Sequence, residues 1–239
     1  MRLSGDRGID RSAAEKGRIT ARPEPAPPEA RTLEPGQHRL GLDGRRDGLL
    51  YLPASYRRDR PAPFALLLHG AGGNAEHGLS LLRYLAEDFG LVLLAVDSRG
   101  RTWDVLLDEY GPDVLFINAA LEHAFSRCAV DPCRVAIGGF SDGASYALSL
   151  GIGNGDLFSH VVAFSPGFMA PPRQEGAPRI YISHGIRDDI LRIDPCSRRI
   201  VPQLERAGYD VRYREFDGPH TIPPEISREA AAWLTAGSP

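Results

Sequence analysis

From Gly36 onward, the sequence alternates short apolar runs with longer amphipathic segments, and this alternation constrains the fold more than any other feature. The runs Phe64–Leu68 and Leu91–Val96 are apolar without a break, as strands are when both faces of their sheet are covered. Segments with helical spacing, such as Glu76–Phe89, separate the apolar runs. Repeated strand–helix units predict an α/β fold with a mostly parallel central sheet and helices on both faces.

The other expected elements extend this pattern into one domain over residues 37–239. A hairpin is expected over Gln37–Leu42 and Gly48–Leu52, around Asp43-Gly44. The later expected strands are Arg134–Ile137, His160–Phe164, Arg179–Ser183 and Asp210–Phe216. The later expected helices are Asp113–Arg127, Ala144–Leu150, Pro195–Ala207 and Pro224–Leu234. No internal repeat and no domain break interrupts this region.

The first 36 residues differ in composition from the rest of the chain. They contain 13 charged residues, five prolines and no aromatic residue. Such a segment buries too little apolar surface to offset the conformational entropy that is lost on ordering. The sequence therefore predicts an extended or disordered arm over residues 1–36. The alternative is a docked arm, which could also mediate self-association.

The composition excludes two classes of partner. The 239 residues carry 28 basic and 31 acidic side chains, and the net charge of −3 provides no chain-wide basic field for nucleic acid or anionic lipid. The apolar runs are far shorter than the ~20 residues of a spanning helix, so no membrane segment is expected. Because residues 1–20 are charged and lack an apolar signal core, we expect a cytoplasmic protein.

The segment Gly139-Phe140-Ser141-Asp142-Gly143 matches the pattern G-x-S-x-G, between an expected strand and an expected helix. The chain must turn sharply there, and the glycines on both sides avoid clashes with the strained serine. The turn projects the hydroxyl above the sheet, and the helix N-terminus behind it favours developing negative charge. We therefore expect Ser141 to be a catalytic nucleophile. A plain strand-to-helix turn is the structural alternative.

A nucleophilic serine needs a base. Of the seven histidines, His220 is the best placed, because it ends the loop between the last expected strand and the last expected helix. That loop could bring the imidazole to the carboxyl edge of the sheet, beside Ser141. The other histidines lie before the core, in expected helices, or next to strands and the glycine-rich loop; they are His38, His69, His77, His123, His160 and His184.

The base in turn needs a carboxylate that orients it. The loop after the strand Arg179–Ser183 contains the adjacent residues Asp188 and Asp189. Catalytic groups in open α/β sheets gather at the carboxyl ends of strands, and both aspartates lie at such an end. The chain order serine, aspartate, histidine is that of the α/β hydrolases. Spacing alone does not choose between the two aspartates.

Acyl chemistry also needs donors for the oxyanion of a tetrahedral intermediate. A glycine-rich loop, His69–Gly73, follows the first buried strand, and we expect the backbone N–H groups of Ala71 and Asp142 to be those donors. Gly70 and Gly72 allow the backbone to approach a substrate closely. A phosphate-binding loop is disfavoured, because no Gly-Lys-Ser/Thr follows and no acidic residue closes a dinucleotide pattern.

Two aromatic residues are expected to contribute to the substrate pocket. Phe140 immediately precedes the expected nucleophile. Trp103 lies in the loop after the strand Leu91–Val96, on the same edge of the sheet. For Trp103, packing inside its own loop is the alternative.

These motifs, in this order, resemble the serine hydrolases of the α/β-hydrolase fold, and more narrowly the phospholipase/carboxylesterase and polyhydroxybutyrate-depolymerase-like esterases. The resemblance covers about Gly48 to Leu234. Its marks are Leu-His-Gly-Ala-Gly-Gly (68–73), Asp-Ser-Arg-Gly-Arg-Thr-Trp-Asp (97–104), Gly-Phe-Ser-Asp-Gly (139–143), Ser-His-Gly-Ile-Arg-Asp (183–188) and Gly-Pro-His (218–220). In these families the acid is usually the aspartate four residues after the histidine of a His-Gly pair, which selects Asp188. The family loop often continues with a proline near the acid, where this chain has Asp189.

The resemblance implies hydrolysis of carboxylic esters by Ser141, Asp188 and His220 through an acyl-enzyme, without a metal or an organic cofactor. An acyltransferase with the same residues and a non-catalytic ligand-binding protein are the alternatives. The three cysteines, at positions 128, 133 and 196, are too few and too irregular for a disulfide framework or a metal motif. No long insertion separates Phe164 from Arg179, so we expect no large lid and a small or soluble ester as the substrate.

Overall fold

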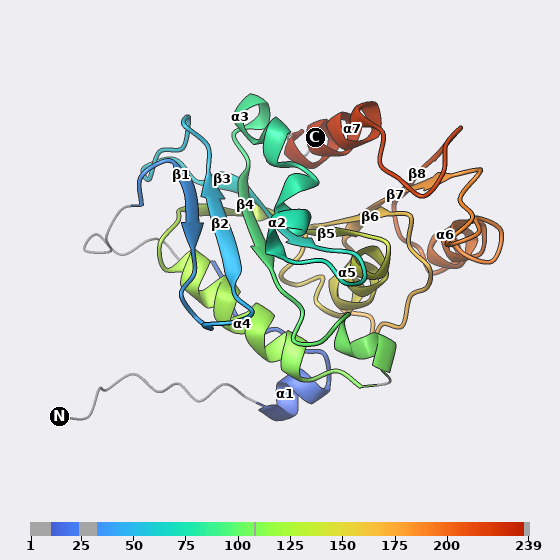
Figure 1. The fold of residues 1–239 in the computed structure, drawn as a ribbon, viewed down its shortest axis with the longest axis horizontal. Coiled ribbons are helices and arrows are strands. Elements are labelled where there is room, and N and C mark those ends of the chain that lie inside the picture. Colours follow the sequence, from blue (N-terminus) through green and yellow to red (C-terminus); the bar gives the residue numbers. More distant parts are fainter. Residues whose placement is uncertain (1–10, 24–32, 108, 237–239) are drawn as a thin grey trace.

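The structure is a computed structural model that describes residues 11–23, 33–107 and 109–236. Within these residues the chain forms an eight-stranded sheet in the order β1-β2-β4-β3-β5-β6-β7-β8 (Figure 1). The strands are β1 (Gly36–Arg39), β2 (Gly48–Leu52), β3 (Ala62–Leu68), β4 (Val92–Val96), β5 (Val130–Phe140), β6 (His160–Phe164), β7 (Arg179–Gly185) and β8 (Val211–Phe216). β2 is antiparallel to β1 and β4, and the other neighbours are parallel.

Helices cover both faces of the sheet. They are α1 (Arg11–Glu15), α2 (Ala75–Ser80), η1 (Arg83–Leu85), α3 (Ala86–Phe89), η2 (Asp104–Leu107), α4 (Pro112–Phe125), α5 (Asp142–Gly153), α6 (Ser197–Arg206) and α7 (Pro224–Thr235). Figure 1 shows α3 and α7 together on one side of the sheet, and α4 and α1 on the other. The mostly parallel α/β architecture expected from the strand–helix alternation is therefore present.

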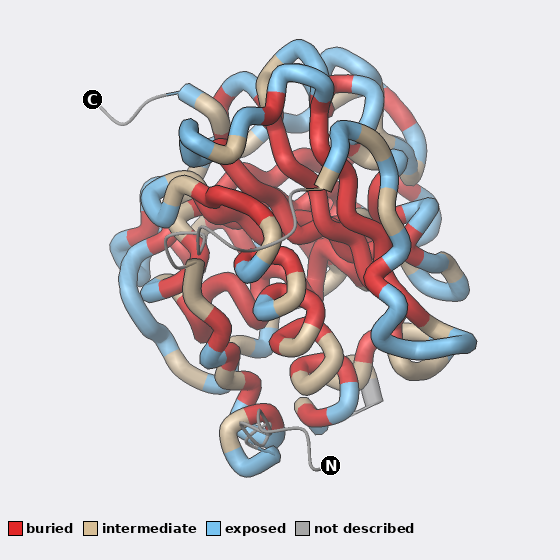
Figure 2. The backbone as a smooth tube through the Cα atoms, turned by 90° about the vertical axis from the view of Figure 1, so that its left-hand side faces the viewer, coloured by how far each residue is buried: buried red, intermediate tan, exposed pale blue. Residues whose placement is uncertain are grey.

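Each face of the sheet carries its own hydrophobic core, because successive side chains of a strand point to opposite faces. In β3, Leu66 and Leu68 belong to the core beneath α4, α5 and α6. Ala65 and Leu67, which alternate with them, belong to the core beneath α2, α3 and α7. Figure 2 shows the consequence, with buried strands through the centre of the molecule and exposed loops around it.

The expected helix over Glu76–Phe89 is broken into α2, the 3₁₀ turn η1 and α3. Its apolar residues Leu79, Leu82 and Leu85 are all fully buried and stand three apart in the sequence. Residues three apart lie on the same side of a 3₁₀ helix and of an α-helix, so the three leucines face the sheet on both sides of the break. The expected apolar face is therefore buried although the helix is interrupted.

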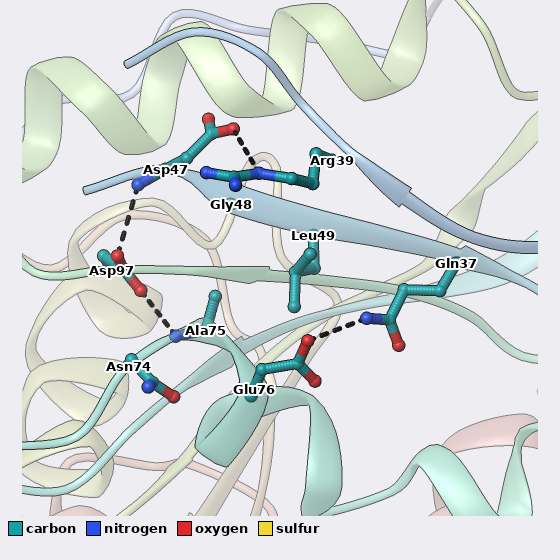
Figure 3. A pocket seen from close by; sticks show the side chains of 9 residues that line it. All are labelled: Gln37, Arg39, Asp47, Gly48, Leu49, Asn74, Ala75, Glu76 and Asp97. Atoms are coloured by element: carbon teal, nitrogen blue, oxygen red, sulfur yellow. Dashed lines mark hydrogen bonds and ion pairs between the residues drawn. The ribbon is translucent and has the colours of Figure 1, made fainter. Parts of the chain in front are cut away.

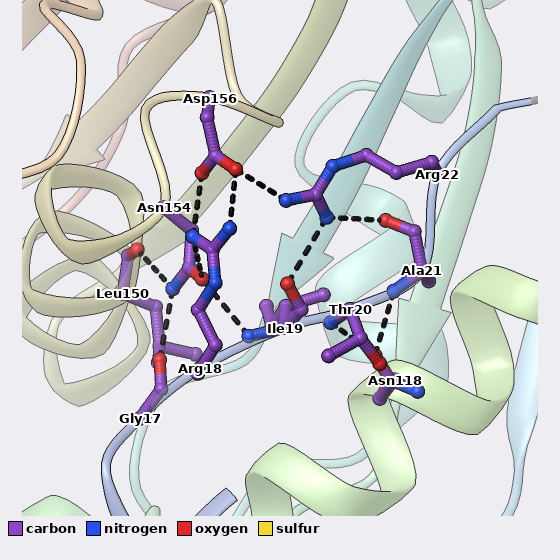
Figure 4. Close-up of polar contacts among 10 residues, drawn as sticks. All are labelled: Gly17, Arg18, Ile19, Thr20, Ala21, Arg22, Asn118, Leu150, Asn154 and Asp156. Carbon is purple, nitrogen blue, oxygen red and sulfur yellow. Dashed lines mark hydrogen bonds and ion pairs between the residues drawn. The ribbon is translucent and has the colours of Figure 1, made fainter. Parts of the chain in front are cut away.

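The arm expected to be extended or disordered over residues 1–36 is docked over residues 11–23, as in the alternative considered above (Figure 4). Ile19 is fully buried, and its N–H donates to Oδ1 of Asn154 at 2.9 Å. The N–H groups of Thr20 and Ala21 donate to Oδ1 of Asn118 at 2.8 and 2.9 Å. The two buried asparagines thus replace the water that the backbone of the arm would otherwise bind.

Charge pairing adds to this docking. Arg18 and Arg22 both form ion pairs with Asp156, which follows α5 (Figure 4). The hydrogen bond from Arg18 lowers the pKa of the Asp156 carboxyl to about 2. The parts of the predicted arm at residues 1–10 and 24–32 lie outside the described residues.

Candidate active site

Ser141 lies at the sharp turn between β5 and α5, in a conformation that side chains rarely adopt. Its φ is 58° and its ψ is −121°. The flanking glycines are required by close backbone contacts, since a Cβ on Gly143 would lie 2.3 Å from the carbonyl oxygen of Leu68. A Cβ on Gly139 would lie 2.4 Å from the backbone of Gly143. The G-x-S-x-G pattern therefore has the structural cause that the sequence analysis gave it.

His220 and Asp188 come from different loops and meet at the carboxyl edge of the sheet. His220 follows β8, Asp188 follows β7, and the Nδ1 atom of His220 lies 2.5 Å from Oδ2 of Asp188. The other oxygen of Asp188 accepts the N–H groups of Ile190 and Leu191 at 3.0 and 2.8 Å. Asp188 is buried, whereas its neighbour Asp189 is exposed. The hydrogen bond to His220 is thus made by Asp188.

The ring of Phe140 links the histidine to the serine turn. Phe140 immediately precedes Ser141, and its ring centroid lies 4.6 Å from that of His220. In the part of the chain that the structure describes, no direct hydrogen bond joins the Ser141 hydroxyl to His220. Hydrogen bonds between catalytic groups are often long or poorly aligned without substrate. The two ring planes are tilted by 35°, and this contact places the imidazole against the residue that precedes Ser141.

A second histidine, which the sequence analysis assigned no role, contacts the same carboxylate. His184 is fully buried at the end of β7, and its Nε2 atom lies 3.2 Å from Oδ2 of Asp188 and 2.7 Å from the carbonyl oxygen of Leu191. Its Nδ1 atom lies 2.7 Å from Oγ of Ser197. Because a carbonyl only accepts, Nε2 carries the hydrogen, and Nδ1 accepts from the serine hydroxyl. Burial lowers the pKa of His184, which favours this neutral form.

The glycine-rich loop after β3 runs next to Ser141. A Cβ on Gly70 would lie 3.4 Å from the Cβ of Ser141, so the two backbones are close. Gly72 donates to the carbonyl oxygen of Arg101 at 2.9 Å, which ties the loop to the one after β4. Within the described residues, the N–H groups of Ala71 and Asp142 have no acceptor. Both are therefore free to donate to a bound group.

Trp103 corrects an expectation, because it does not line a pocket. It is fully buried, and its Nε1–H donates to the carbonyl oxygen of His69 at 2.9 Å. Its ring stacks on Tyr146, with 5.2 Å between centroids and 16° between planes. The His69 carbonyl would otherwise be buried without a donor, so the indole supports the glycine-rich loop from beneath. The alternative of a packed loop tryptophan is the one observed.

A hollow of about 360 Å³ lies between β1, β2 and the start of α2 (Figure 3), and none of Ser141, Asp188 and His220 lines it. Its charged groups are engaged with the protein itself. Asp97 accepts the N–H groups of Ala75 at 2.6 Å and of Asp47 at 3.2 Å. Gln37 donates to Glu76 at 2.8 Å. These contacts hold neighbouring loops together and give the hollow a structural explanation.

Two negative findings concern only residues 11–23, 33–107 and 109–236. No group of three or more His, Cys, Asp or Glu side chains there is arranged to hold a metal ion. No helix among those residues has the length and apolar character to cross a membrane. The three cysteines are free, with Cys128 and Cys196 buried and Cys133 exposed.

The chain was also compared with known proteins, and no family model matches it. It is 31% identical over 146 residues to "Putative esterase NocK" of Nocardia uniformis subsp. tsuyamanensis, covering 56% of this chain and 42% of the relative. It is 27% identical over 172 residues to "Probable feruloyl esterase C" of Aspergillus niger, covering 68% of this chain and 61% of the relative. The chain thus spans less than two thirds of the length of either curated relative.

The fold of this chain is also similar to the folds of solved structures. The crystal structure of esterase PE8 matches with a TM-score of 0.64 at 21% identity, covering 79% of this chain and 97% of that one. The mostly parallel sheet and the helices on both of its faces belong to the same α/β class. The chain therefore has the α/β-hydrolase fold.

Proposed function

We propose that this chain is a serine hydrolase of carboxylic esters, in which Ser141 is the nucleophile, His220 the base and Asp188 the orienting acid. The observation that carries the proposal is the 2.5 Å contact between His220 and Asp188, next to a serine in a strained strand-to-helix turn. The names of the two curated relatives, both esterases, support the same reaction class.

In the first step, Ser141 Oγ attacks the ester carbonyl carbon while Nε2 of His220 takes the hydroxyl proton. Asp188 accepts the Nδ1–H of His220, which fixes the tautomer and stabilises the imidazolium. The carbonyl oxygen becomes an oxyanion, and the N–H groups of Ala71 and Asp142 are available to donate to it. Each such donor typically contributes a factor of ~10²–10³ in rate. The C–O bond to the alcohol then breaks, and the imidazolium returns the proton to the leaving oxygen.

In the second step, water replaces the alcohol. His220 takes a proton from water, and the resulting attack on the acyl-enzyme regenerates an oxyanion at the same two donors. Collapse releases the carboxylic acid and returns the proton to Ser141 Oγ. The sequence of steps needs no metal and no organic cofactor. Small-molecule esters are the substrates we propose, in a cytoplasmic enzyme.

The test is covalent labelling of the purified protein with a fluorophosphonate, with the adduct located by mass spectrometry. We expect the label on Ser141, and loss of both label and hydrolysis of p-nitrophenyl acetate in Ser141→Ala. Ser126→Ala is the matched control, because Ser126 is exposed at the end of α4. A label on another serine, or full turnover by Ser141→Ala, would overturn the proposal.

A further inference from the structure

A second pocket of about 360 Å³ opens beside His220. It lies between the end of α2, the turn η1 and the start of α7, which share one face of the sheet. His220 and Phe140, whose tilted rings are in contact, form the wall nearest the proposed reaction centre. The pocket therefore adjoins the base and not the glycine-rich loop.

Apolar, aromatic and hydroxyl side chains line this pocket. Leu81, Phe140 and Ile222 are half-buried and pack against the core beneath α2 and α7. Tyr84 is 54% exposed, and its hydroxyl lies 3.5 Å from the carbonyl oxygen of Pro224 across the opening. None of the described residues that line the pocket is Asp, Glu, Lys or Arg. The hydroxyl groups of Ser80, Thr221 and Ser227 also line the pocket, so its polar groups are uncharged. A neutral group is therefore the ligand that fits these walls, because a charged group would lose its water without gaining a partner of opposite charge.

The volume and the ring content point to an aromatic group. A cavity of about 150 Å³ holds benzene, so this larger pocket has room for one ring and a short linker. Aromatic rings prefer offset or edge-to-face contact with other rings, and Tyr84, Phe140 and His220 offer three.

The path of the proton determines which half of an ester lies in this pocket. In the proposed reaction, the imidazolium of His220 protonates the departing alcohol oxygen, so the alcohol half must lie next to that ring. The carbonyl oxygen points instead toward Ala71 and Asp142. We propose that the pocket beside His220 binds the leaving alcohol, that Tyr84 determines its specificity, and that neutral alcohols bearing an aromatic ring are preferred. This inference rests on the proposed function and adds a substrate class to it.

Two isomeric esters test the assignment directly. 2-Phenylethyl acetate and ethyl phenylacetate contain the same atoms and differ only in which half carries the ring. We expect kcat/KM to be higher for 2-phenylethyl acetate. Tyr84→Ala removes the outer wall, and Ser80→Trp fills the pocket from an exposed position. The ratio to compare is kcat/KM for 2-phenylethyl acetate divided by kcat/KM for ethyl phenylacetate. Each variant is expected to lower this ratio by roughly 10-fold, because lost contacts to an apolar group have effects of that size.

Controls separate the pocket from general damage. Tyr84→Phe keeps the ring and should keep the ratio, and Leu42→Ala truncates an exposed apolar side chain in the hairpin loop after β1. Two outcomes would overturn the leaving-group assignment in variants that still hydrolyse esters. The first is a kcat/KM ratio that stays unchanged in both Tyr84→Ala and Ser80→Trp. The second is a ratio that rises because kcat/KM for ethyl phenylacetate falls more. If wild type hydrolysed neither isomer nor ethyl acetate and took up no fluorophosphonate, the proposed function would fail, and this inference with it.

Discussion

His184 and His220 approach the same carboxylate oxygen of Asp188 from two different elements. Nδ1 of His220 lies 2.5 Å from Oδ2, and Nε2 of His184 lies 3.2 Å from it. His184 also binds the carbonyl oxygen of Leu191, whose own N–H donates to the other oxygen of Asp188. Asp188 is thus held at Oδ1 by its own loop and at Oδ2 by the two histidines, and His184 also contacts Oγ of Ser197.

We predict that His184 is a positioning residue for the triad. His184→Ala removes a donor to the Asp188 loop, so the carboxylate should lose its alignment with His220, and kcat should fall roughly 10- to 100-fold with KM little changed. His184→Gln places an amide N–H near the position of Nε2 and should recover part of kcat. The measurement is kcat and KM for p-nitrophenyl acetate in both variants. A similar loss in the two variants, or a loss carried by KM, would assign His184 a merely structural role.

The choice between the two aspartates gives a second prediction. Asp188→Asn removes the acceptor for the Nδ1–H of His220 and favours the wrong tautomer, so kcat should fall by up to ~10⁴. Asp189→Asn is the matched control, because Asp189 is exposed and should lose little activity. Both variants should unfold at wild-type temperatures. The assignment is lost if Asp189→Asn is the more damaged enzyme.

Local patterns in the sequence were enough to predict the serine turn and the chain order of the candidate triad. The glycines around Ser141 are dictated by backbone contacts within a few residues and with β3, so a five-residue motif between a strand and a helix was enough to locate it. The carboxyl edge of a parallel sheet then gathers the loops after β7 and β8. This topological rule brings His220 and Asp188 together although 32 residues separate them.

Contacts that depend on side-chain packing could not be predicted in this way. The role of His184 needs Ser197 and Leu191 folded around it, and only its place in a His-Gly pair marked it beforehand. The orientation of Trp103 is decided by one buried carbonyl that needs a donor. The docked arm depends on Asn118, which lies 98 residues from Thr20 in the sequence. Periodic patterns in a sequence do not indicate contacts between residues so far apart.

Docking of the arm should contribute measurably to stability. Ile19 is fully buried, so Ile19→Ala should lower the free energy of unfolding by about 2–4 kcal/mol, the usual cost of emptying a buried aliphatic site. The measurement is urea unfolding followed by circular dichroism. Ile190→Ala is the matched control, because that isoleucine is 67% exposed. Equal stability of the two variants would mean that the arm leaves this site in solution.

The last prediction concerns pH and His160, which opens β6. The side chain is buried, its Nε2 atom has no partner among the described residues, and its ring meets Trp233 edge-on at 4.9 Å. Burial, with Arg179 nearby, lowers the pKa of His160 to about 4 from an ordinary 6.5. Between pH 6.5 and pH 4, His160 is therefore protonated in the unfolded chain but neutral in the folded chain. The free energy of unfolding should therefore fall as pH drops from 6.5 to 4, with His160 contributing up to ~3 kcal/mol.

A variant isolates this contribution. His160→Phe keeps a ring against Trp233 but cannot titrate, so its stability should fall less than that of wild type between pH 6.5 and 4, as measured by urea unfolding. Burial raises the pKa of Asp113 to about 6, and its effect in this window has the opposite sign, with stability lost as pH rises. Because Asp113 is present in both proteins, its effect cancels in the comparison. Parallel pH curves for wild type and His160→Phe would show that His160 takes up its proton equally in the folded and unfolded states.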